Sequence, residues 1–404
     1  MPVQNRDIVI IGLQPWYTPI GSNCKNIALE FSKHNRVLYI NAPLDRKTIL
    51  TERQDHNILH HKDLLKKGND ALVQINPNMW NYFPLSVMES VNWMPSTPLF
   101  RVFNHLNNRR FAKAIRKAIR QLGFRNIILF NDNDIFRGFH LKELLQPEVY
   151  IYYSRDYLLA VDYWKKHGQT MEPLHIAKAD IGVANSKYLT DRLKSYNPNS
   201  YYIGQGCELS LFDPMQNYVR PADMPSGNRP IIGYVGALTI LRLDISLITA
   251  MATRKTQWDF VLVGPEDEDF RQSALHRLPN VHFCGRKAMQ ELPAYIQFFD
   301  ICMNPQLVND MTVGNYPLKV DEYLAMGKPV LATATPTMEL FQDFVYLGTG
   351  VEEYIQAAEK ALADDDAALA LSRRNFALSH TWENSVAGIY AAIENFERQK
   401  TRMQ

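Results

Sequence analysis

Short apolar runs recur along the chain, and stretches with apolar residues at helical spacing separate them. The runs are too short for helices and predict buried strands. In the first half of the chain they occupy residues 7–12, 36–41, 72–75, 126–130 and 149–154. In the second half they occupy residues 231–235, 260–263, 281–283, 301–303 and 330–332. The helical spacing predicts helices at 25–33, 107–125, 245–251, 292–299, 351–363, 366–379 and 382–399. This alternation is typical of α/β domains with mainly parallel sheets.

A polar stretch with several Pro and Gly residues interrupts the alternation at residues 213–230. Its composition predicts a linker. We therefore expect one Rossmann-like domain at 1–212 and a second at 231–380, followed by a helical segment at 381–404. A chain of 404 residues is long enough for two ordinary domains.

The residues just before the strand at 330–332 form the most informative stretch of the chain. Pro317 suits the first position of a helix, because its missing N–H is not needed there. Gly327 is predicted to end this helix, and Pro329 prevents the helix from resuming. The stretch therefore predicts a short helix, a stop and a buried strand.

Two charged residues lie near the start of this predicted helix. A helix N-terminus suits a phosphate, because it offers free N–H groups and the positive end of the helix dipole, and Lys319 adds a full charge there. Glu322 follows on the same face, where a carboxylate can accept hydrogen bonds from sugar hydroxyls. Leu318, Tyr323 and Leu324 are predicted to share the buried face. A lone pair of this kind is more often a solvated surface pair, but the spacing is also what a nucleotide diphosphate sugar requires.

Composition excludes several other classes of protein. The net charge of +2 gives no overall field of the kind that nucleic-acid binding uses, so no nucleic-acid partner is expected. The four cysteines are scattered without C-x-x-C spacing, which favours a reducing compartment and argues against a zinc site. The apolar run at 8–13 is too short for a signal peptide, and no run reaches the length of a membrane span. We expect a cytoplasmic protein.

Three segments resemble one enzyme family. The segment P-x-K-x-x-E-Y-L-A-x-G-K-P-V-x-A-T at 317–333 resembles the donor-binding segment of GT-B glycosyltransferases of the group 1, family 4-like, type. The segment I-G-Y-V-G-A-L at 232–238 resembles the loop that precedes the donor phosphates in that family. The segment Y-Y-I-G-Q-G-C-E-L-S-L-F-D-P at 201–214 resembles the end of its first domain.

The resemblance implies a GT-B fold, in which two Rossmann-like domains face each other across a cleft and the helical segment at 381–404 crosses back to the first. It implies a hexosyltransferase-like enzyme of class EC 2.4. Such an enzyme moves a sugar from a UDP- or GDP-sugar to a saccharide or lipid-linked acceptor in the synthesis of cell-surface polysaccharides or glycoconjugates. Group 1 relatives retain the anomeric configuration.

The same resemblance implies roles for individual residues. Lys319 would contact the donor diphosphate and Glu322 the donor ribose, and Arg242 would join Lys319 as a catalytic clamp on the leaving group. If the enzyme inverts configuration, Asp156 is the first candidate for the base. Further donor-binding positions are Gly21, Gly236, Gly264, Arg286, Thr312, Gly314, Asn315 and Leu318. Many relatives have another glutamate eight residues before the position of Glu322, and this chain has Gly314 at that position.

Three other interpretations of the sequence are a metal-dependent site, a nucleotide-sugar epimerase or hydrolase, and a dinucleotide oxidoreductase. Asp132 and Asp134 have the letters of a D-x-D metal motif, but two such residues after a strand are usually turn or cap residues. We therefore expect no metal ion and no cofactor. A GT-B nucleotide-sugar epimerase or hydrolase remains the alternative function. A dinucleotide oxidoreductase is excluded, because Gly12 is not followed by the glycines of its motif.

The predicted helix at 107–125 is strongly basic. Residues 101–125 contain eight Lys and Arg and no Asp or Glu. Such a helix can meet anionic lipid or a lipid diphosphate acceptor at the inner face of a membrane. The alternative is an ordinary helix that covers a sheet and has a solvated basic side. The sequence favours this alternative, because the apolar face of the helix is only as wide as packing on a core requires.

Overall fold

A computed structural model describes residues 3–18, 21–51, 56–67, 71–310 and 312–403. The chain forms two compact units, the first from residues 1–206 and 382–404 and the second from residues 207–381. The composition of the chain predicted a first boundary at 212 and a linker at 213–230. Residues 207–230 instead belong to the second unit, because ion pairs such as Asp223–Lys287 at 2.7 Å attach them to it.

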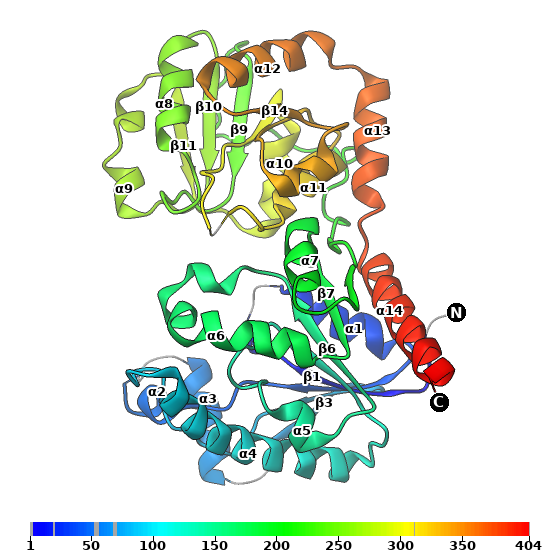
Figure 1. Ribbon diagram of the computed structural model, residues 1–404. Helices are drawn as coiled ribbons and strands as arrows, with labels where there is room; N and C mark the ends of the chain where they lie inside the picture. Colours follow the sequence, from blue (N-terminus) through cyan, green and yellow to red (C-terminus); the bar gives the residue numbers. More distant parts are fainter. Residues whose placement is uncertain (1–2, 19–20, 52–55, 68–70, 311, 404) are drawn as a thin grey trace. The chain divides into compact units, whose positions relative to one another are not determined.

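The first unit contains an eight-stranded sheet in the order β3-β4-β2-β1-β5-β6-β7-β8, parallel except for the β3–β4 pair (Figure 1). The strands are β1 (Asp7–Ile11), β2 (Arg36–Ile40), β3 (Leu72–Asn76), β4 (Met79–Tyr82), β5 (Ile128–Asp132), β6 (Val149–Ser154), β7 (Ile181–Ala184) and β8 (Ser200–Tyr202). The helices are α1 (Asn23–Ser32), α2 (Arg46–Thr51), α3 (His56–Lys67), α4 (Thr97–Leu122), α5 (Leu141–Leu145), α6 (Asp162–Lys178), α7 (Lys187–Lys194) and α14 (Trp382–Met403), with a 3₁₀ turn at Leu158–Ala160.

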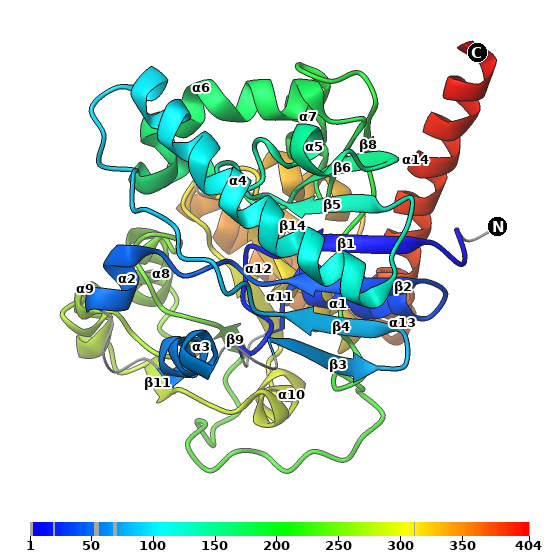
Figure 2. The same ribbon diagram turned by 90° about the horizontal axis from the view of Figure 1, so that it is seen from below.

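Alternate residues of β1 enter different cores on the two faces of this sheet. Val9 and Ile11 pack into the core under α4, α5, α6 and α7, whereas Ile8 and Ile10 pack under α1 and α14. A strand that is buried on both faces reads as a continuous apolar run, and this explains the run at 7–12. Figure 2 shows α4 running diagonally across the first sheet.

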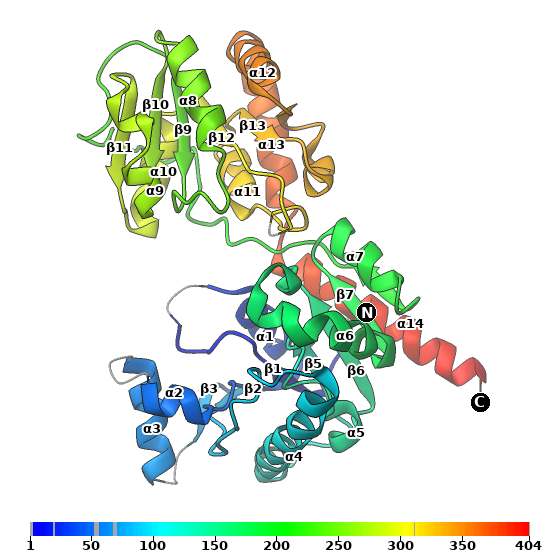
Figure 3. The ribbon, with the colours of Figure 1, turned by 60° about the vertical axis from the view of Figure 1, so that its left-hand side comes forward.

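The second unit contains a six-stranded sheet in the order β11-β10-β9-β12-β13-β14, and all of its strand pairs are parallel (Figure 3). The strands are β9 (Ile231–Val235), β10 (Asp259–Val263), β11 (Val281–Gly285), β12 (Ile301–Asn304), β13 (Val330–Thr333) and β14 (Tyr346–Gly348). The helices are α8 (Ile245–Arg254), α9 (Glu268–Arg271), α10 (Leu292–Gln297), α11 (Leu318–Ala325), α12 (Val351–Asp364) and α13 (Ala367–Leu378), with 3₁₀ turns at Ala274–Arg277, Met289–Glu291 and Pro336–Phe341.

Several elements, among them β4, β8 and β14, were not predicted, and the bounds of α4 and β5 differ from the prediction for identifiable reasons. α4 begins at Thr97 rather than 107, because its first turns bury Asn104 while apolar residues are exposed, which masks the helical period. β5 extends to Asp132 rather than ending at 130. Its last two residues are polar but pair with β6 and are fully buried.

Candidate functional site

The strand order reverses between β9 and β12 in the second unit. β10 and β11 lie on one side of this pair, and β13 and β14 lie on the other. Loops at the carboxyl ends of two such strands diverge and leave a crevice, which is where open α/β sheets bind ligands. The loop after β9 and the loop after β12 meet here, with the Leu307 N–H donating to the Arg242 carbonyl at 2.9 Å.

Two glycines bring the backbone of the neighbouring loops into very close approach. Gly236 and Gly264 have φ angles of 141° and 157°, which side-chain-bearing residues rarely adopt. A Cβ on Gly264 would lie 1.9 Å from the Gly236 carbonyl oxygen. A Cβ on Gly236 would lie 2.8 Å from Nζ of Lys319. Both positions therefore require glycine, and the loop after β9 lies directly beside the Lys319 ammonium.

The Lys319 ammonium is held by Tyr234 of β9. It donates a hydrogen bond to the Tyr234 hydroxyl and lies 4.1 Å from the centroid of that ring, in a cation–π contact. The hydroxyl in turn donates to the Ala237 carbonyl at 3.2 Å. The cation is thus fixed against the loop at the crevice.

The N-terminus of α11 contributes less free backbone than the sequence suggested. Pro317 is the residue that caps the helix, and no side chain caps it. The Leu318 and Val320 N–H groups donate to the carbonyls of Tyr316 and Pro317 at 3.2 and 2.9 Å. The Lys319 ammonium is therefore the main positive feature of this helix end.

Glu322 lies one turn further along α11, half-buried. Among the described residues, none forms a hydrogen bond or ion pair with its carboxylate. Burial raises the pKa of Glu322 to about 7, the positive charge of Lys319 opposes this rise, and the negative charge of Asp321 adds to it. An enclosed carboxylate with unused acceptor capacity is suited to hydroxyl groups of a ligand.

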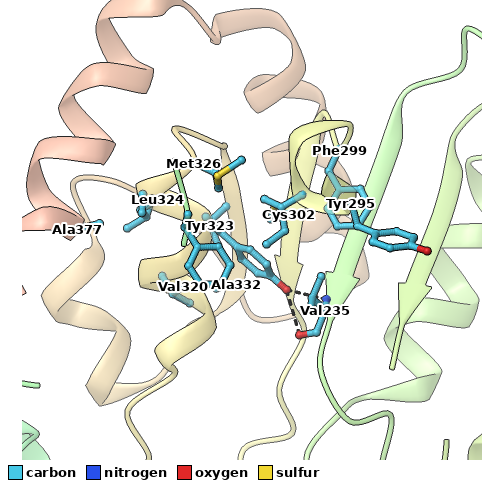
Figure 4. Packing of buried hydrophobic residues seen from close by; sticks show 14 of the residues in the cluster. Val235, Tyr295, Phe299, Cys302, Val320, Tyr323, Leu324, Met326, Ala332 and Ala377 are labelled. Carbon is cyan, nitrogen blue, oxygen red and sulfur yellow. Dashed lines mark hydrogen bonds between the residues drawn. The ribbon is translucent and has the colours of Figure 1, made fainter. Parts of the chain in front are cut away.

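The buried side of α11 fixes its position against the sheet. The Tyr323 hydroxyl accepts a hydrogen bond from the Val235 N–H at 2.8 Å (Figure 4). Tyr323 and Leu324 are fully buried, as predicted, but Leu318 is 41% exposed and does not share their face. Leu318 is the first residue of α11 and is not part of the buried cluster that contains Val320, Tyr323 and Leu324.

Sequence reasoning missed a buried carboxylate on the same helix. Asp321 has no exposed surface, and its oxygens accept hydrogen bonds from Tyr316 Oη at 2.7 Å, His380 Nδ1 at 2.7 Å and Cys207 Sγ at 3.1 Å. These partners come from the loop before α11 and from both ends of the second unit. On a helical wheel, residue 321 lies beside Leu324 on the predicted buried face. This position was the sequence signal that could have indicated that Asp321 is buried.

The other predicted donor-binding residues of the second unit lie in the loops around the crevice or near it. Arg242 is exposed, and no described residue is paired with its guanidinium. Arg286 is exposed and follows β11. Asn315 is half-buried and Gly314 is buried, in the loop after β12. Thr312 is buried in that loop and its hydroxyl donates to the Leu307 carbonyl, so it holds the loop rather than pointing away from it.

The first unit contains the remaining two predicted residues. Asp156 follows β6, its side chain is 40% exposed, and it forms an ion pair of 3.0 Å with Arg155. Gly21 is exposed and directly precedes Ser22, the cap of α1. The structure therefore divides the candidates between the units, with Asp156 and Gly21 in the first and the others in the second.

Both aspartates of the D-x-D pattern form ion pairs with arginines. Asp132 is fully buried and pairs with Arg155 at 2.9 Å, and Asp134 pairs with Arg137 at 2.5 Å. Burial raises the pKa of Asp132, while Arg155 opposes the rise. In the part of the chain that the structure describes, no group of three or more His, Cys, Asp or Glu side chains could hold a metal ion.

A cavity of about 730 Å³ lies in the first unit. Its walls come from the segments that follow β2, β4, β5 and β6, so it opens at the carboxyl edge of the first sheet. Aromatic side chains supply much of its lining, including Trp93, Phe136 and Trp164, together with charged side chains such as Lys47 and Asp162. Flat rings beside polar groups are a common arrangement for binding a saccharide ring.

The described helices include none that is long and apolar enough to cross a membrane.

Comparison with known proteins finds a sequence family that part of the chain matches. Residues 229–364 match the model of the glycosyl transferases group 1. Over 218 residues the chain is 29% identical to the putative teichuronic acid biosynthesis glycosyltransferase TuaH of Bacillus subtilis. That alignment covers 51% of this chain and 55% of TuaH, so the chain matches only about half the length of this relative.

Solved structures resemble the whole chain. Sucrose-phosphate synthase from Thermosynechococcus elongatus matches with a TM-score of 0.66 and 16% identity, covering 99% of this chain and 100% of the other. HepE of Anabaena, solved in complex with UDP, matches with a TM-score of 0.63 and 15% identity, covering 96% and 100%. Trehalose 6-phosphate synthase from Burkholderia multivorans matches with a TM-score of 0.67 and 10% identity, covering 100% and 99%.

Proposed function

We propose that the protein is a glycosyltransferase of the group 1 type that transfers a sugar from a nucleotide diphosphate sugar to an acceptor. Its GT-B fold and the match of residues 229–364 to the group 1 family model support this. The observation that carries the proposal is the arrangement at the strand-order reversal. There the Lys319 ammonium lies beside the Gly236 backbone, and Glu322 lies one turn away with its carboxylate unused.

In this proposal the second unit stabilises the leaving group. Lys319 and Arg242 meet the negative charge that grows on the diphosphate as the bond to the sugar breaks. Gly236 allows the phosphates to approach the backbone, since a side chain there would collide with Lys319. Glu322 accepts hydrogen bonds from the ribose hydroxyls. No metal ion or cofactor takes part.

UDP-sugars are the first donors to test, with GDP-sugars next. HepE, a structural relative, has been solved with UDP and with UDP-glucose, and this supports the choice. The loop after β12 would contact the sugar, and Gly314 gives it no carboxylate where many relatives have one. Asn315, which is half-buried in that loop, is the side chain best suited to replace it.

The acceptor is proposed to bind the first unit. Its cavity has aromatic walls and opens at the carboxyl edge of the sheet, and this supports a saccharide, free or lipid-linked, as the acceptor. The TuaH relative is named for teichuronic acid biosynthesis, and this supports a role in the synthesis of a cell-surface polysaccharide or glycoconjugate. The cytoplasm is the compartment that we propose for this reaction. Retention of configuration is proposed, and Asp156 is the base if the enzyme inverts instead.

The decisive experiment incubates the protein with a panel of nucleotide sugars, with and without saccharide acceptors. Release of nucleoside diphosphate that depends on an acceptor, with a matching product mass, is the expected result. Nuclear magnetic resonance of the product gives the anomeric configuration. Conversion of the donor at the same rate without any acceptor would overturn the proposal in favour of an epimerase or hydrolase.

A further inference from the structure

The outward face of α4 carries a stripe of exposed apolar side chains. Leu99, Val102, Phe103 and Leu106 are 44%, 61%, 38% and 48% exposed. They follow the spacing i, i+3, i+4 and i+7, which places them on one face over two turns. The opposite face of the helix packs on the first sheet. Single exposed apolar residues are ordinary, but four together on one face mark an interaction surface.

The same face becomes basic in the following turns. Arg109, Lys113, Lys117 and Arg120 are exposed, and no described residue pairs with their charges. Residues seven apart lie on the same face of a helix, so Lys113 and Arg120 continue the line of Leu106. No Asp or Glu occurs in α4. Figure 2 shows α4 on the side of the first unit that faces the viewer.

We propose that this face of α4 docks on the surface of an anionic lipid bilayer. The apolar stripe would enter the boundary between headgroups and acyl chains, and the cations would lie over anionic headgroups. Trp93, in the loop before α4, is 73% exposed and suits the same boundary. The inference is independent of the donor site, because all of these residues lie in the first unit.

Charge complementarity favours a lipid surface over a protein. Arg110 on this face pairs with Glu89 at 3.0 Å, but no described residue pairs with Arg109, Lys113, Lys117 or Arg120, so a protein partner would have to present a matching cluster of negative charge. A bilayer with anionic lipid presents one sign of charge over a wide area, directly above an apolar layer. The sequence alone favoured an ordinary solvated basic helix. The exposed apolar stripe, which the predicted helix at 107–125 did not include, is the observation that changes this.

The test is sedimentation of the full chain with vesicles of phosphatidylcholine alone and of phosphatidylcholine mixed with phosphatidylglycerol. The wild type is expected to bind the mixed vesicles much more strongly, and added salt is expected to weaken this binding. The variant with Lys113→Gln, Lys117→Gln and Arg120→Gln should lose about tenfold or more in affinity for mixed vesicles. The variant with Val102→Ser, Phe103→Ser and Leu106→Ser should lose binding to a similar degree.

Two control variants are matched to the α4 variants. One removes three positive charges outside α4, and the other replaces three exposed apolar side chains of α13. Lys187→Gln, Lys194→Gln and Lys360→Gln change exposed lysines outside α4. Leu369→Ser, Leu371→Ser and Leu378→Ser change exposed leucines of α13. Both controls should bind like the wild type. Thermal unfolding of every variant shows whether it is folded.

Three outcomes would overturn the proposal. The first is no difference between the two kinds of vesicle for the wild type. The second is equal loss in the α4 variants and their controls. The third is concentration-dependent self-association, measured by analytical ultracentrifugation, that Phe103→Ser abolishes while vesicle binding persists. That result would assign the stripe to a second copy of the chain.

Discussion

Lys319 illustrates how one residue combines position and charge. Its ammonium is held by Tyr234, close to a backbone that only glycine can form. The sequence predicted the lysine and the glycine from their resemblance to a family motif. It did not predict the tyrosine contact, because a cation and an aromatic ring 85 positions apart in the chain leave no local pattern.

Removing either proposed cation should impair turnover far more than folding. Lys319→Ala and Arg242→Ala are each expected to lower the rate by about 10²–10³, because both groups meet charge that grows in the transition state. Steady-state kinetics with the preferred donor measures this effect. Lys360→Ala, which removes an exposed lysine of α12, is the control and should leave the rate unchanged. Unchanged turnover in both folded site variants would refute the clamp.

Tyr234→Phe separates the two contacts of Lys319. The ring remains, so the cation–π contact is kept, but the hydroxyl that links Lys319 to the Ala237 carbonyl is lost. We expect kcat to fall by about tenfold, a loss close to that of one hydrogen bond to a charged group, with KM changed little. A rise in KM with kcat unchanged would show that Tyr234 acts in donor binding rather than in positioning Lys319 for the reaction.

Glu322 should make nucleotide binding depend on pH near neutrality. Its pKa is raised to about 7, so the carboxylate form increases from pH 6 to 8, and this form accepts the hydroxyl hydrogen bonds. Affinity for a nucleoside diphosphate is therefore expected to rise by up to about tenfold across that range. Glu322→Gln should bind more weakly at pH 8 and show a flatter profile. Isothermal titration calorimetry at several pH values measures both.

The same shift has a defined effect on stability. The pKa of Glu322 in the folded protein lies above its ordinary value of 4.5. The Glu322 carboxyl group therefore contributes its full stabilisation of the fold below pH 4.5, and this stabilisation is lost as the pH rises through about 7. Relative to the wild type, Glu322→Gln should therefore gain unfolding temperature between pH 4.5 and pH 8. A constant difference across this range would place the carboxyl in solvent.

At the scale of elements, the sequence predicted α11 and β13 well because local signals agree. Gly327 ends the helix with φ of 73°, and Pro329 precedes the strand, as the sequence indicated. The exposed end at Leu318 and the buried Asp321 were not predicted. Both depend on which side of the helix meets partners distant in sequence, such as His380, and periodicity alone does not supply that information.

Asp321 is expected to stabilise the second unit strongly. Its carboxylate satisfies Tyr316, His380 and Cys207 at once, so Asp321→Ala leaves several buried polar groups without an acceptor. We expect a loss of about 3–5 kcal/mol in the free energy of unfolding of this unit. Chemical denaturation followed by fluorescence measures it. Asp310→Ala, at an exposed position in the same loop region, should be nearly neutral.

At the scale of the molecule, the alternation of strands and helices predicted two doubly wound units, and solved structures that match the whole chain confirm the predicted GT-B fold. The division of the chain was less predictable. Residues 213–230 have the composition of a linker, but Asp213 and Asp223 form ion pairs with Arg374 and Lys287. Composition does not reveal partners of this kind.

The whole molecule leads to a last prediction, on metal dependence. A donor diphosphate needs positive charge beside it, and a divalent ion can supply that charge where the protein does not. In this chain the second unit offers Lys319 and Arg242. The acidic pair Asp132 and Asp134 belongs to the first unit, where Arg155 and Arg137 already neutralise it. We therefore expect transfer to proceed at an unchanged rate in excess chelator.

The measurement compares the rate of acceptor-dependent transfer in chelator alone with the rate after adding back magnesium or manganese. A variant with a weakened clamp sharpens the test, because Arg242→Ala should become more sensitive to added magnesium if cations near the diphosphate are interchangeable. The wild type should show no such response. Complete loss of wild-type transfer in chelator, restored by either metal, would show that the phosphate charge is met by an ion and not by these two side chains.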